Sequence, residues 1–260
     1  PGHREIGCRW HAVTLSTPNK HMNIQSKKTG RDGFTLVETV IAIGILVVLL
    51  TGFLAVFGPA ARSIKKTLSI DEASRLQDTL LLELTTIRDG EERQRFQGDP
   101  FLKAINWIAQ SEEQGETILI YKYRAIPGQE RQDGSLAPAG RGLAISGSDF
   151  IVEPMVRRLS DNLIEEDLQS VEGRVFFVKL RQLVFGQQGV EVSDQPGQIV
   201  DPYRPGANFA GNPLAYPEAV VSFQAEYFNL PSTSLNFLRT NFDPYNYTRP
   251  IFTRNLSVRR

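Results

Sequence analysis

The sequence predicts an α+β protein, in which one long N-terminal helix packs on an antiparallel β-sheet with long loops. Apolar residues dominate, or recur at helical spacing, from residue 34 to about residue 90. The alternating, β-branched and aromatic segments typical of strands all follow residue 116. Pro- and Gly-rich stretches separate these segments and are typical of loops. We therefore expect a globular α+β domain over residues 91–260.

The first part of the predicted helix has the length and composition of a membrane span. Twenty residues, from Thr39 to Gly58, contain no charged side chain. At about 1.5 Å per residue they reach roughly 30 Å, the thickness of the hydrocarbon core of a bilayer. Because the segment is apolar on all sides, we predict a transmembrane helix over residues 34–60, and a buried core helix is the alternative. The predicted membrane-facing residues are Val40, Ile41, Ile43, Ile45, Leu46, Val47, Val48, Leu49, Leu50, Phe53 and Leu54.

The helix is expected to continue as an amphipathic segment over residues 61–90. Gly58 and Pro59 should kink it between its two halves, because proline lacks the backbone donor and its ring clashes with the preceding turn. Asp89-Gly90 is a stop signal. The apolar stripe expected to face the sheet contains Ile64, Leu68, Leu76, Leu80, Leu84 and Ile87.

A short basic stretch with Lys27, Lys28 and Arg31 precedes the apolar segment. The first methionine is Met22, and residues 1–21 show neither apolar periodicity nor a signal-peptide core. We expect synthesis to start at Met22, which makes residues 22–33 a leader. The alternative is that residues 1–21 are a disordered extension. Basic residues flank both ends of the apolar segment, so charge alone does not orient it.

Glu38 lies at the head of the apolar segment. A carboxylate is costly at this position unless it meets a cation. A membrane helix by itself gains nothing from it, so we expect Glu38 to be paired in an assembly.

Residues Gly33-Phe34-Thr35-Leu36-Val37-Glu38, between a basic leader and about twenty apolar residues, closely resemble the processing motif of type IV prepilins and of the pseudopilins of type II secretion systems. The resemblance covers roughly residues 27–90 and implies a pilin-like fold. It implies that a membrane prepilin peptidase cuts after Gly33 and that Phe34 becomes the N-methylated N-terminus. It further implies that Glu38 neutralises the Phe34 amine, of its own or a neighbouring subunit, inside a helical filament.

The resemblance also implies a single-pass inner-membrane protein with a cytoplasmic leader and a periplasmic or extracellular C-terminal domain. The expected partners are prepilin peptidase, other pilin or pseudopilin subunits, an inner-membrane assembly platform and membrane lipid. The segment from Phe34 onward is longer than the compact major subunits of the family, which favours a minor component.

The remaining elements follow from local patterns. Strands are predicted over residues 117–126, 174–185, 219–227 and 250–258. Short helices are predicted over residues 101–110 and 160–168, with Ser160 as the cap of the second. Long loops are predicted over residues 127–147 and 194–217.

Composition excludes several classes of function. The formal net charge is zero, so no basic surface points to nucleic acid. The only cysteine is Cys8, and the only histidines are His3, His11 and His21, all before Phe34. Loss of the leader would leave no thiol and no imidazole, which rules out disulfides, Cys or His metal sites and His-based catalysis in the mature chain. We expect no enzymatic activity and no cofactor.

Some polar and aromatic groups remain, and none has the spacing of a known site. Gly140-Arg141-Gly142 lacks the strand–turn–helix context of a nucleotide-binding loop. A calcium site is not predicted either, because the oxygen ligands available in the late loops lack the spacing of a calcium loop. These ligands are Asp194, Asp201, Asp243 and Asn246.

Two further groups are interpreted as structural. The first is a group of acidic residues that is typical of the N-terminal turn and exposed face of a helix. It consists of Asp161, Glu165, Glu166 and Asp167. An aromatic group predicts edge packing, with a partner contact as the alternative, and consists of Phe237, Phe242, Tyr245 and Tyr247.

The leading hypothesis is a structural, prepilin-like subunit of a type IV pilus or of a type II secretion pseudopilus. The alternatives are a membrane-tethered exported binding module outside any filament, and a tethered hydrolase. Glu38 argues against the binding module, and the lack of His and Cys after Phe34 argues against the hydrolase.

Overall fold

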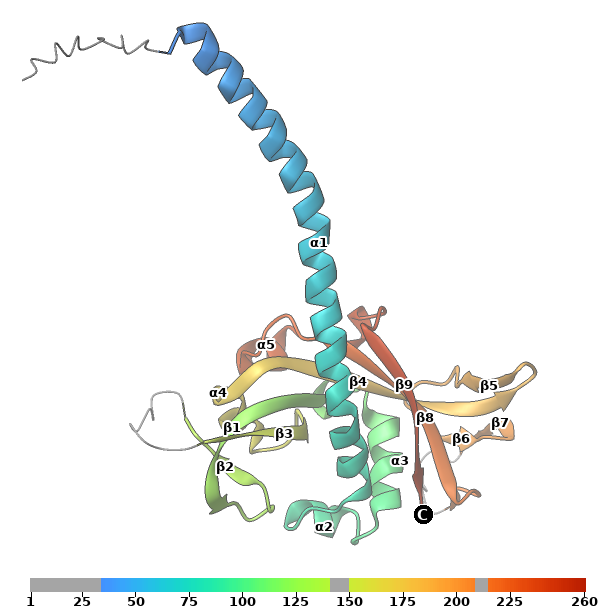
Figure 1. The fold of residues 1–260 in the computed structure, drawn as a ribbon. Helices are drawn as coiled ribbons and strands as arrows, with labels where there is room; N and C mark the ends of the chain where they lie inside the picture. The colour runs from blue at the N-terminus through green and yellow to red at the C-terminus, as the bar shows by residue number, and fades with distance from the viewer. Residues whose placement is uncertain (1–33, 141–149, 209–214) are drawn as a thin grey trace, which may run out of the picture. The chain divides into compact units, whose positions relative to one another are not determined.

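A computed structural model describes residues 34–140, 150–208 and 215–260 (Figure 1). The chain divides into two compact units, residues 1–55 and 56–260. In the described part, the first unit is the beginning of the long helix α1 (Leu36–Thr85). The second unit contains the rest of α1 and the sheet that follows, and is called the C-terminal domain below.

Helix α1 confirms the predicted long N-terminal helix. It has 50 residues and continues through Gly58 and Pro59, so a kink there stays a prediction. It ends at Thr85, before the predicted stop at Gly90. Gly90 has a positive φ of 91° and directly precedes α2 (Glu91–Arg95). The Lys103 ammonium of α3 (Pro100–Gln110) donates to the carbonyl oxygen of Thr86 at 2.8 Å. A side chain from another helix therefore satisfies a carbonyl just past the end of α1.

The C-terminal domain is built on a seven-stranded sheet with the order β2-β1-β4-β8-β9, in which β3 also pairs with β1 and β5 with β4. All of these pairings are antiparallel, which confirms the predicted fold class. The strands are β1 (Ile118–Glu130), β2 (Leu136–Pro138), β3 (Ile151–Arg158), β4 (Val171–Gly186), β5 (Gly189–Val192), β8 (Val220–Asn229) and β9 (Phe252–Arg259). A separate two-stranded sheet pairs β6 (Val200–Asp201) with β7 (Arg204–Asn208).

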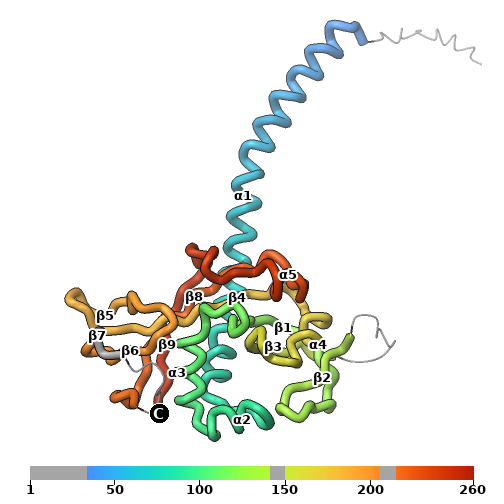
Figure 2. The backbone as a smooth tube through the Cα atoms, turned by 180° about the vertical axis from the view of Figure 1, so that it is seen from behind, coloured from blue at the N-terminus to red at the C-terminus, as the bar shows by residue number. Residues whose placement is uncertain are grey.

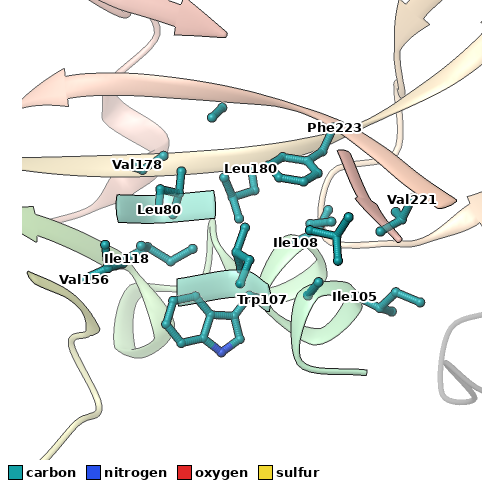
Figure 3. Packing of buried hydrophobic residues seen from close by; sticks show 14 of the residues in the cluster. Leu80, Ile105, Trp107, Ile108, Ile118, Val156, Val178, Leu180, Val221 and Phe223 are labelled. Atoms are coloured by element: carbon teal, nitrogen blue, oxygen red, sulfur yellow. The ribbon is translucent and has the colours of Figure 1, made fainter. Parts of the chain in front are cut away.

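The sheet carries helices on both faces (Figures 1 and 2). One face packs against α1 and α3, and Figure 3 shows Leu80, Trp107 and Leu180 in this core. The other face packs against α4 (Ile164–Gln169) and α5 (Leu235–Thr240). Alternation along β1 serves both faces, because Ile118 and Ile120 belong to the first core while Leu119 and Tyr121 belong to the second. Single turns occur at η1 (Gln114–Glu116) and η3 (Pro244–Asn246).

The four predicted strands correspond to β1, β4, β8 and β9. Strand β3 was not predicted. Pro154 and three charged residues of this strand, Glu153, Arg157 and Arg158, interrupt its apolar pattern. The stretches predicted as loops contain the end of β1 and the short strands β2, β6 and β7. These short strands pair through backbone hydrogen bonds, which do not require a particular pattern of side chains.

The two predicted short helices have different outcomes. Helix α3 is confirmed, and Asp99 Oδ1 caps it by accepting from the backbone N–H of Phe101 at 2.8 Å. The predicted start of α4 at Ser160 is wrong, because the helix begins at Ile164. Ser160 instead donates to Glu116 Oε2 at 3.3 Å, while Asp161 Oδ1 accepts from the backbone N–H of Leu163 at 2.8 Å.

The predicted apolar stripe of α1 is correct only in its later part. Leu76, Leu80 and Leu84 are buried, whereas Ile64 and Leu68 are 60% and 56% exposed. The first buried residue of α1 is Ser69, so the exposed residues Ile64 and Leu68 lie before the buried part of the helix.

A Leu80→Ala substitution should therefore lower the free energy of unfolding of the C-terminal domain by about 3 kcal/mol, through lost burial and the cavity left behind. Leu68→Ala removes the same atoms from an exposed position and should change the free energy of unfolding by less than about 0.5 kcal/mol. Urea unfolding of the full chain in detergent micelles, followed by tryptophan fluorescence in a Trp10→Phe background that leaves Trp107 as the reporter, measures both. Equal losses for the two variants would contradict this description of the stripe.

Candidate functional site

The residues predicted for processing and assembly lie at the start of α1. Gly33, which precedes the predicted cleavage point, lies outside the described residues. Phe34 and Thr35 come just before the helix, and Phe34 is 83% exposed. The described part of the chain therefore leaves the Phe34 side chain open to contact with another molecule.

Glu38 and Thr35 cap the first turn of α1 reciprocally. The backbone N–H of Glu38 donates to Thr35 Oγ1 at 3.2 Å, and the backbone N–H of Thr35 donates to Glu38 Oε2 at 3.4 Å. This is the capping box of Ser/Thr followed three residues later by Glu, and it places a negative charge where the helix dipole favours one. The inference that Glu38 contributes nothing within its own chain is therefore wrong. Within the described residues Glu38 Oε1 makes no hydrogen bond, so that oxygen remains available to a further donor.

Behind this cap, the predicted membrane-facing residues are exposed on every side of α1. Their exposed fractions run from 52% at Phe53 to 72% at Val48. The polar residue inside this stretch is satisfied locally, because Thr51 Oγ1 donates to the carbonyl oxygen of Val47 at 2.8 Å. None of the most apolar part of α1 is buried against the other described residues. Such a surface is stable in lipid or against other apolar helices.

Comparison with known families bears on this segment. Residues 28–54 match the family model of the prokaryotic N-terminal methylation motif. The N-terminal segment of the chain is type IV pilin-like. Its long apolar helix fits a single-pass membrane anchor that begins at the motif. No curated protein and no solved structure matches the chain significantly, so the pilin-like assignment rests on this motif and on the α+β layout.

Thr35 is the residue of the motif whose local hydrogen bonds to Glu38 were not predicted from the sequence. The signal was present, because Thr35-Leu36-Val37-Glu38 fits the capping-box pattern at the start of an apolar helix. The prediction rested on the charge of Glu38 and did not include its hydrogen bonds to Thr35.

A cluster of charged side chains is buried in the C-terminal domain. Arg157 of β3 is 2% exposed and Asp167 of α4 is fully buried. Arg157 Nε donates to Asp167 Oδ2 at 2.6 Å, while its Nη1 lies 2.9 Å from Asp161 Oδ2 and 3.0 Å from Asp133 Oδ2. The prediction of an exposed face is therefore wrong for Asp167, which can be buried because cations surround it.

Asp167 accepts hydrogen bonds from three side chains. Besides Arg157, they are Tyr121 Oη at 2.7 Å and Arg131 Nη1 at 2.8 Å. Burial and the negative charge of Asp167 raise the pKa of Tyr121 well above its ordinary value of 10.0, so the phenol stays protonated and donates. Burial disfavours the charged form of Arg157, but Asp161 and Asp167 outweigh it and raise the pKa of its guanidinium. This cluster fixes α4 to strands β1 and β3 of the sheet.

A neighbouring cluster joins the end of α1 to α3. Lys103 is fully buried, and its Nζ lies 2.7 Å from Glu83 Oε1 and 2.9 Å from Glu92 Oε1. Arg88 Nη2 lies 2.6 Å from Glu83 Oε2. Burial alone would raise the pKa of Glu83, but Lys103 and Arg88 outweigh it and hold the pKa below 4.5.

Side chains of both clusters line a cleft of about 600 Å³, including Glu83, Arg88, Asp133 and Arg157. Among these lining residues, Arg88 pairs with Glu83 and Arg157 with Asp133. Paired charges offer little to a ligand, so we assign the cleft a structural role.

Two of the four candidate oxygen ligands accept hydrogen bonds in local turns. Asp243 Oδ1 accepts from the backbone N–H of Tyr245 at 3.0 Å, and Asp201 Oδ1 from that of Tyr203 at 2.9 Å. In the described ranges no group of three or more His, Cys, Asp or Glu side chains is placed to hold a metal ion. Arg141 and Gly142 of the glycine-rich candidate lie outside those ranges.

The aromatic group near the end of the chain divides into two parts. Phe242 and Tyr247 each lie 5.0 Å from the ring of Phe177 in edge-on contact, and Phe237 packs against the same core. These three residues pack internally, whereas Tyr245 is 62% exposed.

Proposed function

We propose that this pilin-like chain is a structural subunit of a type IV pilus or a type II secretion pseudopilus. In this proposal prepilin peptidase cuts after Gly33, and Phe34 becomes the N-methylated first residue. The subunit is inserted in the inner membrane with its C-terminal domain outside the cytoplasm. It then joins a filament by packing its apolar helix against those of other subunits, with an inner-membrane assembly platform as a further partner.

The single observation that carries the proposal is the arrangement of Glu38 at the head of an exposed apolar helix. One carboxylate oxygen of Glu38 caps its own helix, and the other has no hydrogen-bond partner within the described residues. Cleavage after Gly33 would create an ammonium group at Phe34, close to this oxygen along the chain or presented by a neighbouring subunit. In an apolar filament core an unpaired charge is costly, whereas a close pair offsets much of that cost. Pairing would therefore set the axial register of subunits.

The length of the chain from Phe34 onward supports a minor rather than a major component. Membrane lipid would be a partner of the subunit before assembly, because no other part of the described chain covers the apolar helix. A structural subunit needs no catalytic group, in keeping with the paired charges of the cleft.

The capping box allows the charge of Glu38 to be tested apart from its local role. Glu38→Gln keeps a carbonyl oxygen for the Thr35 N–H but removes the negative charge. We expect Glu38→Gln to insert in the membrane at the wild-type level and to be lost from the sheared filament fraction by about tenfold or more, as a missing buried ion pair predicts. Immunoblots of membrane and filament fractions measure both quantities.

Thr35→Val is the matched control, because it removes the hydroxyl of the cap and leaves the carboxylate. A lost cap costs the helix about 1 kcal/mol, which a membrane-embedded helix tolerates, so this variant should assemble. Normal assembly of Glu38→Gln, or a failure of Thr35→Val as severe as that of Glu38→Gln, would overturn the charge-pairing argument.

A further inference from the structure

A basic groove lies beside α1 in the C-terminal domain, and its volume is about 660 Å³. Three segments form it: the part of α1 around Lys65, the start of β4 and the residues that follow β8. Its lining contains three cations, Lys65, Lys66 and Arg174, and no acidic residue. Leu230 and Pro231 add an apolar wall.

Gly173 explains how β4 comes close enough to α1 to form this groove. Its φ of 84° favours glycine, and a Cβ there would lie 2.9 Å from Glu72 Oε1. The neighbouring Arg174 is half-buried and reaches along the helix, where its Nη1 donates to the carbonyl oxygen of Lys65 at 3.3 Å. The fold thus holds the Arg174 guanidinium beside Lys65, although the two residues are far apart in the sequence.

The cations of the groove have no carboxylate partner in the described part of the chain. Between Thr39 and Ile70 the sequence contains basic residues but no acidic one. The next acidic residues are engaged elsewhere, because Asp71 pairs with Arg75 at 3.0 Å and Glu72 with Lys122 at 3.2 Å. The groove therefore holds three cations that pair with no carboxylate of the described residues.

The position of the groove along the chain indicates its ligand. Lys65 follows Gly58, the end of the charge-free segment, by about two helical turns, or about 10 Å along the helix axis. Lysine and arginine side chains can span much of that distance while their apolar stems stay against the protein. Their head groups can then reach the polar region of the membrane that holds α1.

We propose that this groove binds the phosphate of an anionic phospholipid headgroup in that membrane. The Arg174 guanidinium offers a planar pair of donors to the phosphate, and Lys65 and Lys66 add mobile charges. Leu230 and Pro231 border the less polar part of the lipid. The site requires only a membrane-anchored α1 and does not depend on cleavage after Gly33. Lipid binding can therefore be tested independently of filament assembly.

The test uses the full chain in zwitterionic detergent micelles that contain phosphatidylglycerol and phosphatidylcholine with the same acyl chains. Native mass spectrometry counts the lipid of each kind that the protein retains. The groove variant combines Lys65→Gln, Lys66→Gln and Arg174→Gln. The matched control combines Arg239→Gln, Arg249→Gln and Arg254→Gln, which removes the same charge from exposed positions elsewhere in the same domain.

The wild type should prefer phosphatidylglycerol, and the groove variant should lose this preference by about 100-fold, since each cation near an anionic lipid contributes about a factor of five. The control variant should keep it. Equal losses in both variants, or no preference in the wild type, would overturn the proposal.

Two further results would also overturn it. If inorganic phosphate displaces the lipid as effectively as added phosphatidylglycerol does, the groove is a site for free anions. If the groove variant keeps its lipid preference but loses chemical crosslinking between chains in the membrane, the groove is a contact between subunits.

Discussion

An Asp167→Ala substitution should lower the free energy of unfolding of the C-terminal domain by about 3–5 kcal/mol, the usual cost of removing one partner from a buried ion pair. Arg157 would keep Asp161 and Asp133 near its Nη1, but its Nε would lose an acceptor at 2.6 Å. Tyr121 Oη would lose its acceptor as well, inside a fully buried site. Urea unfolding of the full chain in micelles measures the change.

Glu166→Ala is the matched control for this prediction. Glu166 is the adjacent acid, and its side chain is 62% exposed although it lies 3.0 Å from Arg131 Nη2. An exposed pair contributes less than about 1 kcal/mol. If Asp167→Ala costs no more than Glu166→Ala, the buried network does not hold α4 to the sheet.

A Lys103→Met substitution should have the next largest effect and lower the free energy of unfolding of the C-terminal domain by about 3 kcal/mol. The variant keeps the length and apolar stem of the side chain but removes the ammonium that Glu83, Glu92 and the Thr86 carbonyl share. Glu83 would keep only Arg88 while still buried. Lys122→Met is the control, because Lys122 is one-third exposed and its ion pair among the described residues is with Glu72, so its loss should cost less than about 1 kcal/mol.

The pH dependence of unfolding gives Lys103→Met a second readout. The Glu83 pKa is lowered in the folded chain, so this group contributes stability above its ordinary value of 4.5 and loses it as pH falls through the folded value. Lys103 supplies part of that lowering. The difference in unfolding free energy between wild type and Lys103→Met should therefore shrink as the pH is taken from 7 to below 4. A difference that stays constant over this range would show that the substitution acts through packing alone.

The parts of the fold predicted from sequence are those whose signal is local. Strand β8 alternates along its own length, and the apolar segment of α1 is continuous, so each could be predicted without knowledge of its neighbours. Strand β3 could not, because Arg157 and Arg158 look like surface residues until their partners are known. Tyr121 and Asp167 are separated by 46 residues in the sequence, and only the fold brings them together.

The candidate site shows the same division. Phe34 and Glu38 were predicted from a contiguous motif, and the Thr35–Glu38 cap could have been predicted from the same four residues. The basic groove could not be predicted, because Arg174 meets Lys65 across 109 residues and only through the close approach that Gly173 allows. Lys65 and Lys66 alone resemble an ordinary solvated helix face.

The intact mass of the protein recovered from the membranes of cells that contain a prepilin peptidase tests the central claim most directly. The proposed function predicts a chain that begins at Phe34 and carries one additional methyl group on its N-terminal amine. A chain that retains Gly33 and the residues before it, or one cut at another position, would contradict the assignment as a processed filament subunit.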